Sequence, residues 1–347
     1  MVIHRSARCL FLLWVYLLNQ NLYQNTVYEA QHALTARHTL LDSAFRFITR
    51  SAAALTFAIV IGVLVILVIG AYPALEKFGI GFVSSSAWNP VSEEFGAIPA
   101  IFGTLMTSLI ALLFAVPLSF GIALYINEVA PRWLQRPVGI AIELLAAIPS
   151  IIYGMWGLFI FSPLFADHMQ PWISEHIGDW PLLGPLFTGP PMGIGMFTAG
   201  LILAIMVMPF ITTIMREVFS LVPNELKESA RGLGATTWEI VWKIVLPYTR
   251  VGVIGGIMLG LGRALGETMA VTFVIGNAHD ISPSLFMPGA TISSTLANEF
   301  TEAVGDIYTS SLYALGLILF VITFVVLVLS RLLLLHLELK SGRSAVR

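Results

Sequence analysis

The chain has 347 residues, of which 57% are hydrophobic and only 11% are charged, and its mean hydropathy is +0.86. A soluble core of this size cannot bury so much apolar surface, so the chain is expected to lie in a bilayer. The net charge is -2, with no basic patch interleaved with aromatic residues, which excludes a typical nucleic-acid partner.

The chain offers little for a metal ion or a cofactor. Cys9 is the only cysteine, so an intrachain disulfide and a site built from several thiolates are excluded. The histidines do not have the spacing of metal ligands, and zinc or haem is not expected. We therefore predict no cofactor and no metal site.

An amino-terminal segment, 1–45, precedes the first long apolar stretch. Arg5 and Arg8 stand before the apolar run 10–18, an order that is found in signal peptides. We reject a signal peptide because the run is short, no small-residue cleavage site soon follows, and export would carry the next arginines outward. We expect 1–45 to be a cytoplasmic or interfacial extension, as an interfacial helix or an over-long start assignment.

Six apolar stretches are long enough to cross a bilayer, because a transmembrane helix needs about 20 predominantly apolar residues. They lie near residues 51–72, 100–126, 138–165, 192–215, 251–276 and 311–335. We therefore predict an all-α membrane protein with six transmembrane helices, a transmembrane domain over 46–340 and a cytoplasmic tail over 341–347. Pro149 falls inside the third stretch and is expected to kink it.

Lys and Arg are distributed unevenly among the connections between these stretches. They are frequent on alternate connections, whereas the opposite connections contain Lys77 as their only basic residue, together with many acidic residues. The positive-inside rule places the basic connections in the cytoplasm. Both termini are therefore predicted to be cytoplasmic.

The longest basic connection, 216–250, is patterned like two short amphipathic helices. Asn224 suits an N-cap, and two apolar stripes with helical spacing follow it. Gly232 and Gly234 stand between the stripes, where one helix can end before another begins. We predict a pair of short helices along the cytoplasmic face of the membrane.

A fixed order of residues runs through the same connection. It comprises Glu228, Ser229, Ala230, Gly234, Ile244, Leu246 and Pro247. This order resembles the EAA loop of permeases in binding-protein-dependent ABC importers, E-A-A-x3-G-x9-I-x-L-P, with Ser229 in place of the first Ala. The resemblance implies that 224–247 contains a coupling helix that seats in a groove of a cytoplasmic ATPase, with Gly234 at the bend. An ordinary interfacial helix pair explains the amphipathic pattern but not the complete spacing.

The sequence lacks the loop that binds the phosphates of ATP. No G-x-x-x-x-G-K-[ST] occurs in the chain, so ATP hydrolysis must belong to another subunit.

The glycines of the fifth stretch are expected to serve helix packing. They lack the spacing and setting of a dinucleotide fingerprint. Small residues allow membrane helices to approach closely, and we expect one packing face with Gly256 and Gly260 and another with Gly255, Gly262 and Gly266.

Arg263 and Glu267 lie near the middle of the same stretch, four residues apart. On a continuous helix this spacing puts them on one face, where they can pair. An arginine at a helix centre costs about 2.5–3.5 kcal/mol on insertion scales, so it is expected to have an interior partner, a pathway or a substrate. One interpretation is an ion pair that only orients the helix. The other is that Arg263 meets an anion in transit while Glu267 neutralises it when the pathway is empty.

Three longer segments identify a more specific resemblance. They are EVAPRWLQRPVGIAIELLAAIPSIIYGMWGLFIFSPLF, ESARGLGATTWEIVWKIVLPYT and GLGRALGETMAVTFVIGN. Together they resemble phosphate-specific ABC permeases of the PstC type, over about 74–335, a type I importer (MetI-like) fold. The resemblance implies a PstA-type partner permease, two copies of a PstB-type ATPase, a periplasmic phosphate-binding protein and a bacterial inner membrane. It also implies that Arg263 and Glu267 take part in phosphate passage.

Other function classes remain open at this point. An ABC permease for another oxyanion would share most of these features. An intramembrane enzyme could use Glu143 or Glu267 as a base, but the sequence lacks a paired nucleophile or metal set. A proton-coupled secondary transporter could use Glu267 as its relay, but it leaves the EAA loop unexplained.

Overall fold

The computed structural model describes residues 42–181 and 183–340. The predicted extension 1–45 lies almost entirely outside this part of the chain, and the predicted tail 341–347 lies wholly outside it. Six described helices are long and apolar enough to cross a membrane, as predicted. They are Asp42–Phe78, Ile98–Val129, Ser150–Ile177, Met196–Ser220, Thr237–Leu265 and Asp306–His336.

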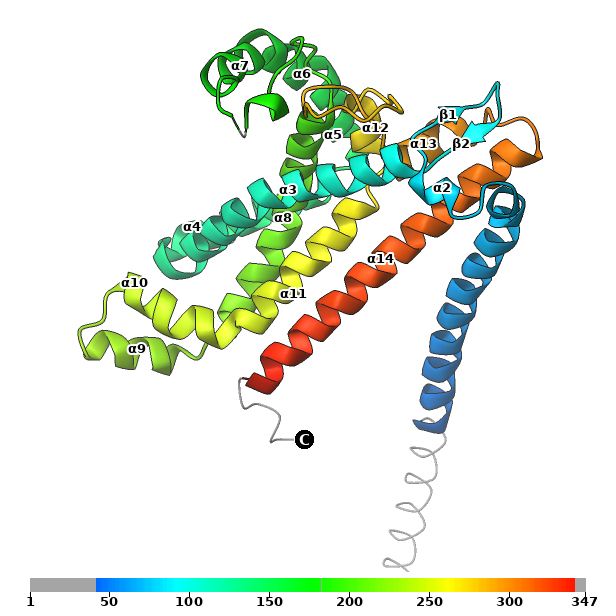
Figure 1. The fold of residues 1–347 in the computed structure, drawn as a ribbon. Coiled ribbons are helices and arrows are strands. Elements are labelled where there is room, and N and C mark those ends of the chain that lie inside the picture. The colour runs from blue at the N-terminus through cyan, green and yellow to red at the C-terminus, as the bar shows by residue number, and fades with distance from the viewer. Residues whose placement is uncertain (1–41, 182, 341–347) are drawn as a thin grey trace, which may run out of the picture. The chain divides into compact units, whose positions relative to one another are not determined.

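The chain divides into two units, residues 1–65 and residues 66–347. The described residues of the first unit, 42–65, belong to the helix Asp42–Phe78, and most of them are exposed. The second unit contains the remaining elements, labelled in Figure 1. In chain order they are α2 (Gly81–Ser84), β1 (Trp88–Asn89), β2 (Glu94–Phe95), α3 (Ile98–Leu124), η1 (Tyr125–Val129), α4 (Arg132–Ala146), α5 (Ser150–Trp156), η2 (Gly157–Phe161), α6 (Ser162–Leu164), η3 (Phe165–Met169), α7 (Gln170–Ile177), η4 (Gly184–Leu186), α8 (Met196–Ser220), α9 (Asn224–Gly232), α10 (Thr237–Ile240), η5 (Val241–Val245), α11 (Leu246–Leu265), α12 (Met269–Val274), α13 (Ile292–Glu299) and α14 (Asp306–Lys340).

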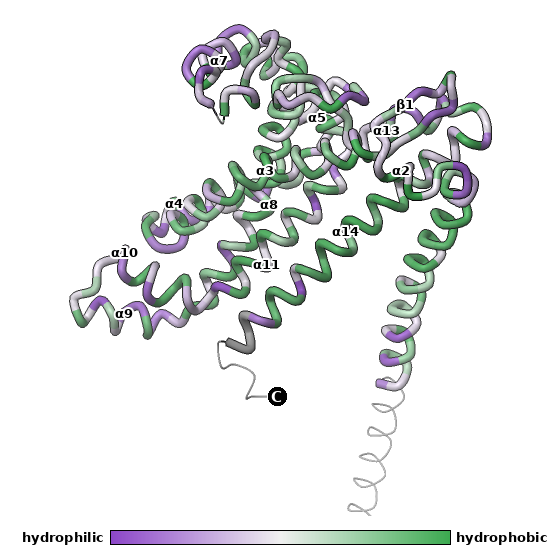
Figure 2. Tube along the Cα trace, viewed as in Figure 1, coloured by the Kyte–Doolittle hydropathy of each residue, from purple (hydrophilic) through white to green (hydrophobic). Residues whose placement is uncertain are grey.

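Helix α8 forms the centre of the larger core of this unit. It packs along α3 and also against α11, α4 and α12. Its side chains Leu203, Val207, Ile211 and Met215 recur at helical spacing and are completely buried, which marks a helix with protein on most of its faces. By contrast, α14 is apolar along nearly its whole length (Figure 2) and exposes many large apolar side chains, as expected next to lipid.

Glycines set the distance between α11 and α8. A Cβ atom on Gly260 would stand 2.6 Å from Ile211, and one on Gly256 would stand 3.0 Å from Ile214. The predicted packing face with these two glycines is therefore confirmed. No described element packs on the predicted second face, where a Cβ on Gly255 or Gly262 would meet nothing within 4 Å, so that face stays a prediction.

A second, smaller core joins the start of α14 to the segment before α3. Strands β1 and β2 form an antiparallel pair in which Trp88 faces Phe95. Phe95 stacks on Tyr308 of α14 at 5.2 Å between ring centroids. These contacts fix the connection between the first described helix and α3 against α14.

The third predicted stretch, 138–165, is not one helix. Helix α4 ends at Ala146, and Pro149 adopts an extended ψ of 137° before α5 begins at Ser150. Proline disfavours helix in the residue before it, so Pro149 separates two helices where a kink was predicted. The membrane span begins after it and continues to Ile177.

The fifth predicted stretch, 251–276, is shifted along the chain. The span covers Thr237–Leu265, so the second apolar stripe of the EAA loop runs directly into the membrane helix. The predicted first short helix is confirmed as α9, its position along the membrane face stays a prediction, and the prediction of a second separate helix is wrong. Pro247, the second residue of α11, directly follows the π-helical turn η5 and does not interrupt the span.

Candidate functional site

The first half of the EAA loop (224–247) is a short helix followed by a sharp bend. Helix α9 begins at Asn224, one residue after its N-cap position, and ends at Gly232. Gly234 follows with φ +86°, a left-handed conformation that costs other residues about 1–2 kcal/mol. The predicted bend at Gly234 is confirmed, and its cause is the backbone conformation, because a Cβ there would meet no atom within 4 Å.

The second half of the loop starts with a capping box. The Thr236 hydroxyl accepts a hydrogen bond from the backbone N–H of Glu239, and the Glu239 carboxylate accepts one from the N–H of Thr236. This arrangement satisfies N–H groups that every helix start leaves free. The next turn, η5, is π-helical and leads into α11 without a break.

The residues of the EAA signature divide into an exposed group and a packed group. Glu228 and Ser229 are exposed on α9, and Pro247 is exposed at the start of α11. Ala230 and Ile244 pack against the larger core. Leu233, which the signature does not include, is 90% exposed beside the bend.

Lys227 is the one side chain that α9 buries. Its ammonium forms an ion pair with the Glu128 carboxylate of η1, and the two side chains are 9% and 2% exposed. The sequence did not predict this pair, since the residues are far apart along the chain. The available signal was that Glu128 is the only acidic residue of the basic connection between α3 and α4.

Other polar contacts join the end of α8 to the same region. The Asn127 side chain donates a hydrogen bond to the backbone carbonyl of Arg216 at 2.7 Å. The Arg216 guanidinium pairs with Glu143 of α4 at 3.0 Å, and it lies against Gly139, where a Cβ would collide with it. The turn η1 therefore contacts both α8 and α9 through neighbouring residues.

Arg263 lies in the last turn of α11, inside the span Thr237–Leu265. Its side chain is exposed, and its guanidinium carbon stands 5.8 Å from the centre of the Phe210 ring. Within residues 42–181 and 183–340, no carboxylate lies within ion-pair distance of it. A cation in this position is available to an anion.

The predicted pairing of Arg263 with Glu267 is wrong in this structure. Helix α11 ends at Leu265, with Gly266 as its C-cap, so Glu267 does not lie one helical turn above Arg263. Its half-buried carboxylate instead accepts a hydrogen bond from the N–H of Ala270 at 3.3 Å, at the start of α12. The prediction assumed a continuous helix through the glycine.

Helix α13 lies at the opposite end of α11 from the EAA loop (Figure 1), and its last residue, Glu299, joins several segments. Its carboxylate accepts hydrogen bonds from Trp88 at 2.8 Å, from Tyr308 at 2.8 Å and from Nε2 of His279 at 2.7 Å. Trp88 also stacks on His279. We call Glu299, Trp88, His279 and Tyr308 the Glu299 cluster.

The donors of the Glu299 cluster determine the charge of its carboxylate. Burial raises the pKa of Glu299, but the hydrogen bonds from His279, Tyr308 and Trp88 outweigh burial and hold the pKa below its ordinary value. The carboxylate is therefore ionised at neutral pH, and His279 must donate from Nε2, since an ionised carboxylate can only accept. The sequence did not predict this cluster.

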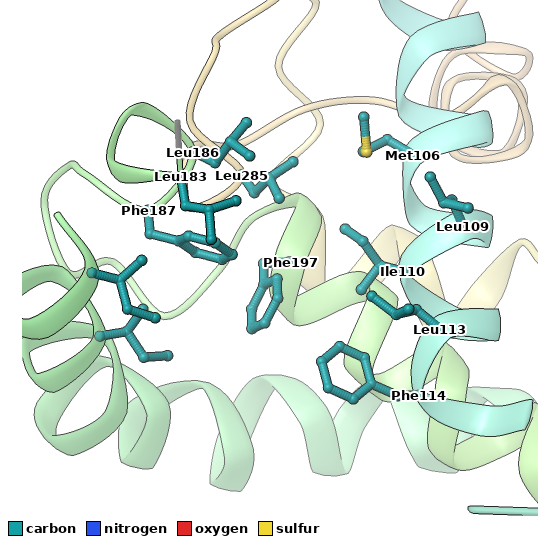
Figure 3. A pocket seen from close by; sticks show the side chains of 12 residues that line it. Met106, Leu109, Ile110, Leu113, Phe114, Leu183, Leu186, Phe187, Phe197 and Leu285 are labelled. Carbon is teal, nitrogen blue, oxygen red and sulfur yellow. The ribbon is translucent and has the colours of Figure 1, made fainter. Parts of the chain in front are cut away.

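The pocket drawn in Figure 3 is unsuited to an anion. It lies between α3, α7, α8 and the loop around η4, and all its lining side chains are apolar. Among them are Met106, Phe114, Phe197 and Leu285. A charged or polar ligand would lose its hydration here without a hydrogen-bond partner, so this pocket is not a candidate substrate site.

Comparison with known proteins places these features in a family. Residues 115–338 match the family described as "Binding-protein-dependent transport system inner membrane component". The chain is 59% identical over 306 residues to the phosphate transport system permease protein PstC of Pasteurella multocida, covering 88% of this chain and 95% of that protein. The chain belongs to the PstC family of permeases. PstC of Mesorhizobium japonicum is 56% identical over 316 residues, covering 91% of this chain and 97% of that protein.

Solved structures support the fold of a type I importer permease. A bacterial alginate ABC transporter, in complex with its alginate-bound periplasmic protein, aligns with a TM-score of 0.53 and 20% identity, covering 84% of this chain and 96% of that chain. The MetNI methionine ABC transporter in an inward-facing conformation aligns with a TM-score of 0.51 and 16% identity, covering 69% and 95%. As a PstC-family permease, the chain is a transport subunit of an ABC complex that contains further subunits.

Proposed function

We propose that the chain is a membrane-spanning subunit of an ATP-driven importer and that inorganic phosphate crosses the membrane along it. The relatives named above are phosphate transport permeases. The structural observation that carries the proposal is Arg263, an exposed guanidinium inside a membrane span.

Arg263 suits phosphate for a physical reason. A planar guanidinium matches the oxygens of phosphate and is always charged. The described residues give it an aromatic neighbour, Phe210, and no carboxylate at ion-pair distance, so an arriving anion does not have to displace an ion pair. Glu267, half-buried just beyond the end of α11, is proposed as the second pathway residue. Its negative charge would repel an anion that stays and thereby favour release.

The test is Arg263→Gln in the assembled transporter. A hydrogen bond to a charged group is worth about 1.5–3 kcal/mol, so phosphate uptake should fall about ten- to a hundredfold. The amount of assembled complex should not change, because no carboxylate loses its partner. Radiolabelled phosphate uptake and complex yield are measured in the same cells, with Arg250→Gln on the same helix as the control.

Two results would contradict this assignment. Normal uptake by Arg263→Gln would exclude Arg263 from the pathway. A loss of complex that Glu267→Gln restores would point to the ion pair predicted from the sequence, and recovery of uptake in that double variant would make the pair structural only. If Arg263→Gln lowered the uptake of arsenate or sulfate while phosphate uptake stayed normal, a permease for another oxyanion would be favoured.

The proposed partners follow from the EAA loop and from the PstC family. A PstA-type permease would complete the pathway as a heterodimer, two copies of a PstB-type ATPase would hydrolyse ATP, and a periplasmic phosphate-binding protein would deliver the substrate. The proposed ATPase contact consists of Glu228, Ser229, Ala230, Gly234, Ile244, Leu246 and Pro247. Uptake that survives removal of the ATPase but collapses with the proton gradient would favour a secondary transporter.

The EAA loop also gives the proposed orientation in a bacterial inner membrane. The basic connections belong on the cytoplasmic side, so the EAA loop and both termini are assigned to the cytoplasm. The Glu299 cluster would then face the periplasm. The domain limits proposed are an extension over 1–45, a permease domain over 46–340 and a tail over 341–347.

A further inference from the structure

The attachment of α9 to the rest of the protein is unusual for a short surface helix. Such helices are normally held by an apolar face. Here Leu226 is 45% exposed, Leu233 just after the helix is 90% exposed, and the single buried side chain is that of a lysine. The contact that holds α9 most specifically is therefore the ion pair between Lys227 and Glu128.

The position of Glu128 shows which part of the membrane domain the ion pair joins to α9. Glu128 lies in η1, the π-helical turn that ends the span Ile98–Val129. π-Helical turns are frequent at functional sites. The preceding residue, Asn127, holds the backbone carbonyl of Arg216 at the end of α8. The turn η1 thus binds α9 through Glu128 and contacts α8, the central helix of the core, through Asn127.

The burial of the pair makes the contact stiff. With 9% and 2% of the side chains exposed, neither charge can exchange its partner for water, and separating them leaves an uncompensated buried charge. When α9 is displaced, η1 must therefore move with it, because separating the two buried charges costs too much free energy. The exposed pair Lys243–Glu239, with side chains 73% and 41% exposed, has no such constraint, because water can replace either partner.

We propose that the Lys227–Glu128 pair transmits movement of α9 into the span Ile98–Val129, so that both are positioning residues for transport. This inference rests on the proposed function, in which an ATPase moves the EAA loop. Both side chains are buried, so the pair is not part of the surface that α9 offers to another protein. Its loss should separate ATP hydrolysis from uptake.

The test uses the complete transporter, co-expressed with its partner permease and ATPase and reconstituted with the phosphate-binding protein. The double variant Lys227→Met with Glu128→Leu removes both charges and should assemble, because replacing a buried pair with apolar residues is tolerated. It should retain its ATPase, while phosphate uptake per ATP hydrolysed falls about tenfold. The matched control is Lys243→Met, which should keep the normal ratio.

The outcomes separate transmission from scaffolding. If the pair only supports the fold, the assembled double variant takes up the normal amount of phosphate per ATP, and that result overturns the proposal. Should the double variant not assemble, another pair of apolar replacements, Lys227→Leu with Glu128→Met, takes its place with the same two outcomes.

A third variant distinguishes this inference from the proposed function. Leu233→Glu changes a 90% exposed side chain beside the bend and should release the ATPase without unfolding the subunit. If Leu233→Glu retains the ATPase and transports normally, the EAA loop is not the docking surface and the proposed function fails at that point. If Leu233→Glu releases the ATPase while the double variant couples normally, only the inference fails.

Discussion

The two ends of the second unit bury a carboxylate in different ways. At the EAA-loop end, Glu128 has a single partner among residues 42–181 and 183–340, the ammonium of Lys227. At the opposite end, Glu299 is shared by three donors from three segments, Trp88, His279 and Tyr308. A two-member pair is lost completely with either member, whereas a shared carboxylate keeps part of its stabilisation when one donor is lost. The first arrangement suits transmission, and the second suits a fixed support.

The largest expected effect comes from breaking the two-member pair on one side only. Glu128→Leu strands the Lys227 ammonium in the interior, and the loss of one buried partner typically costs about 3–5 kcal/mol. The midpoint of thermal unfolding of the complex in detergent should fall strongly.

Glu143→Leu is the matched control for this prediction. It removes the partner of Arg216 at the same end, but the Glu143 side chain is 53% exposed, so about 1 kcal/mol or less is expected. Equal losses in the two variants would show that burial of Glu128 is not what makes its pair strong.

An intermediate effect is expected from removing one donor of the Glu299 cluster. Tyr308→Phe deletes a hydrogen bond to an ionised group, which is worth about 1.5–3 kcal/mol, while Trp88 and His279 still hold the carboxylate. Tyr313→Phe, on the same helix, keeps its ring contact with Phe300 and should be close to neutral. A loss in Tyr308→Phe as large as that in Glu128→Leu would contradict the idea that the cluster shares its load.

The smallest expected effect is a change of stability with pH at the Glu299 cluster. Because the pKa of Glu299 is lower in the folded protein than its ordinary value of 4.5, the unfolded chain binds this proton first as pH falls. The stabilisation is therefore complete above pH 4.5 and is lost progressively below it.

Unfolding midpoints between neutral and acidic pH measure this dependence. Gln cannot ionise, so in Glu299→Gln the unfolding midpoint should fall less steeply with pH below 4.5 than in the unmodified protein. An identical slope in the variant and the unmodified protein would exclude Glu299 as its source.

Local patterns of sequence predicted much of this fold. Apolar length was sufficient for six spans, and glycine chemistry was sufficient for the bend at Gly234. Hydropathy did not reveal the end of α11 at Leu265, because α11 and α12 are both apolar and a hydropathy window averages across Gly266. The separation of α4 from α5 at Pro149 was missed for the same reason.

The polar contacts of the candidate sites could not be predicted in this way. Lys227 and Glu128 stand 99 positions apart, and Trp88 and Glu299 stand 211 apart. Their encounter depends on how whole helices pack, which no local window contains. The motif located the EAA loop, but only the tertiary structure indicates how that loop is fastened to the membrane helices.

The π-helical turn η5, Val241–Val245, has a consequence for how the loop is aimed. A π turn holds one residue more than the α turn it replaces. Deleting one residue there would leave a regular α-helix. The segment before the deletion, including α9, would then rotate by about 100° about the axis of α11 and move by about 1.5 Å along it. The one extra residue of η5 thus determines the direction in which α9 points around the axis of α11, and with it whether Lys227 can reach Glu128.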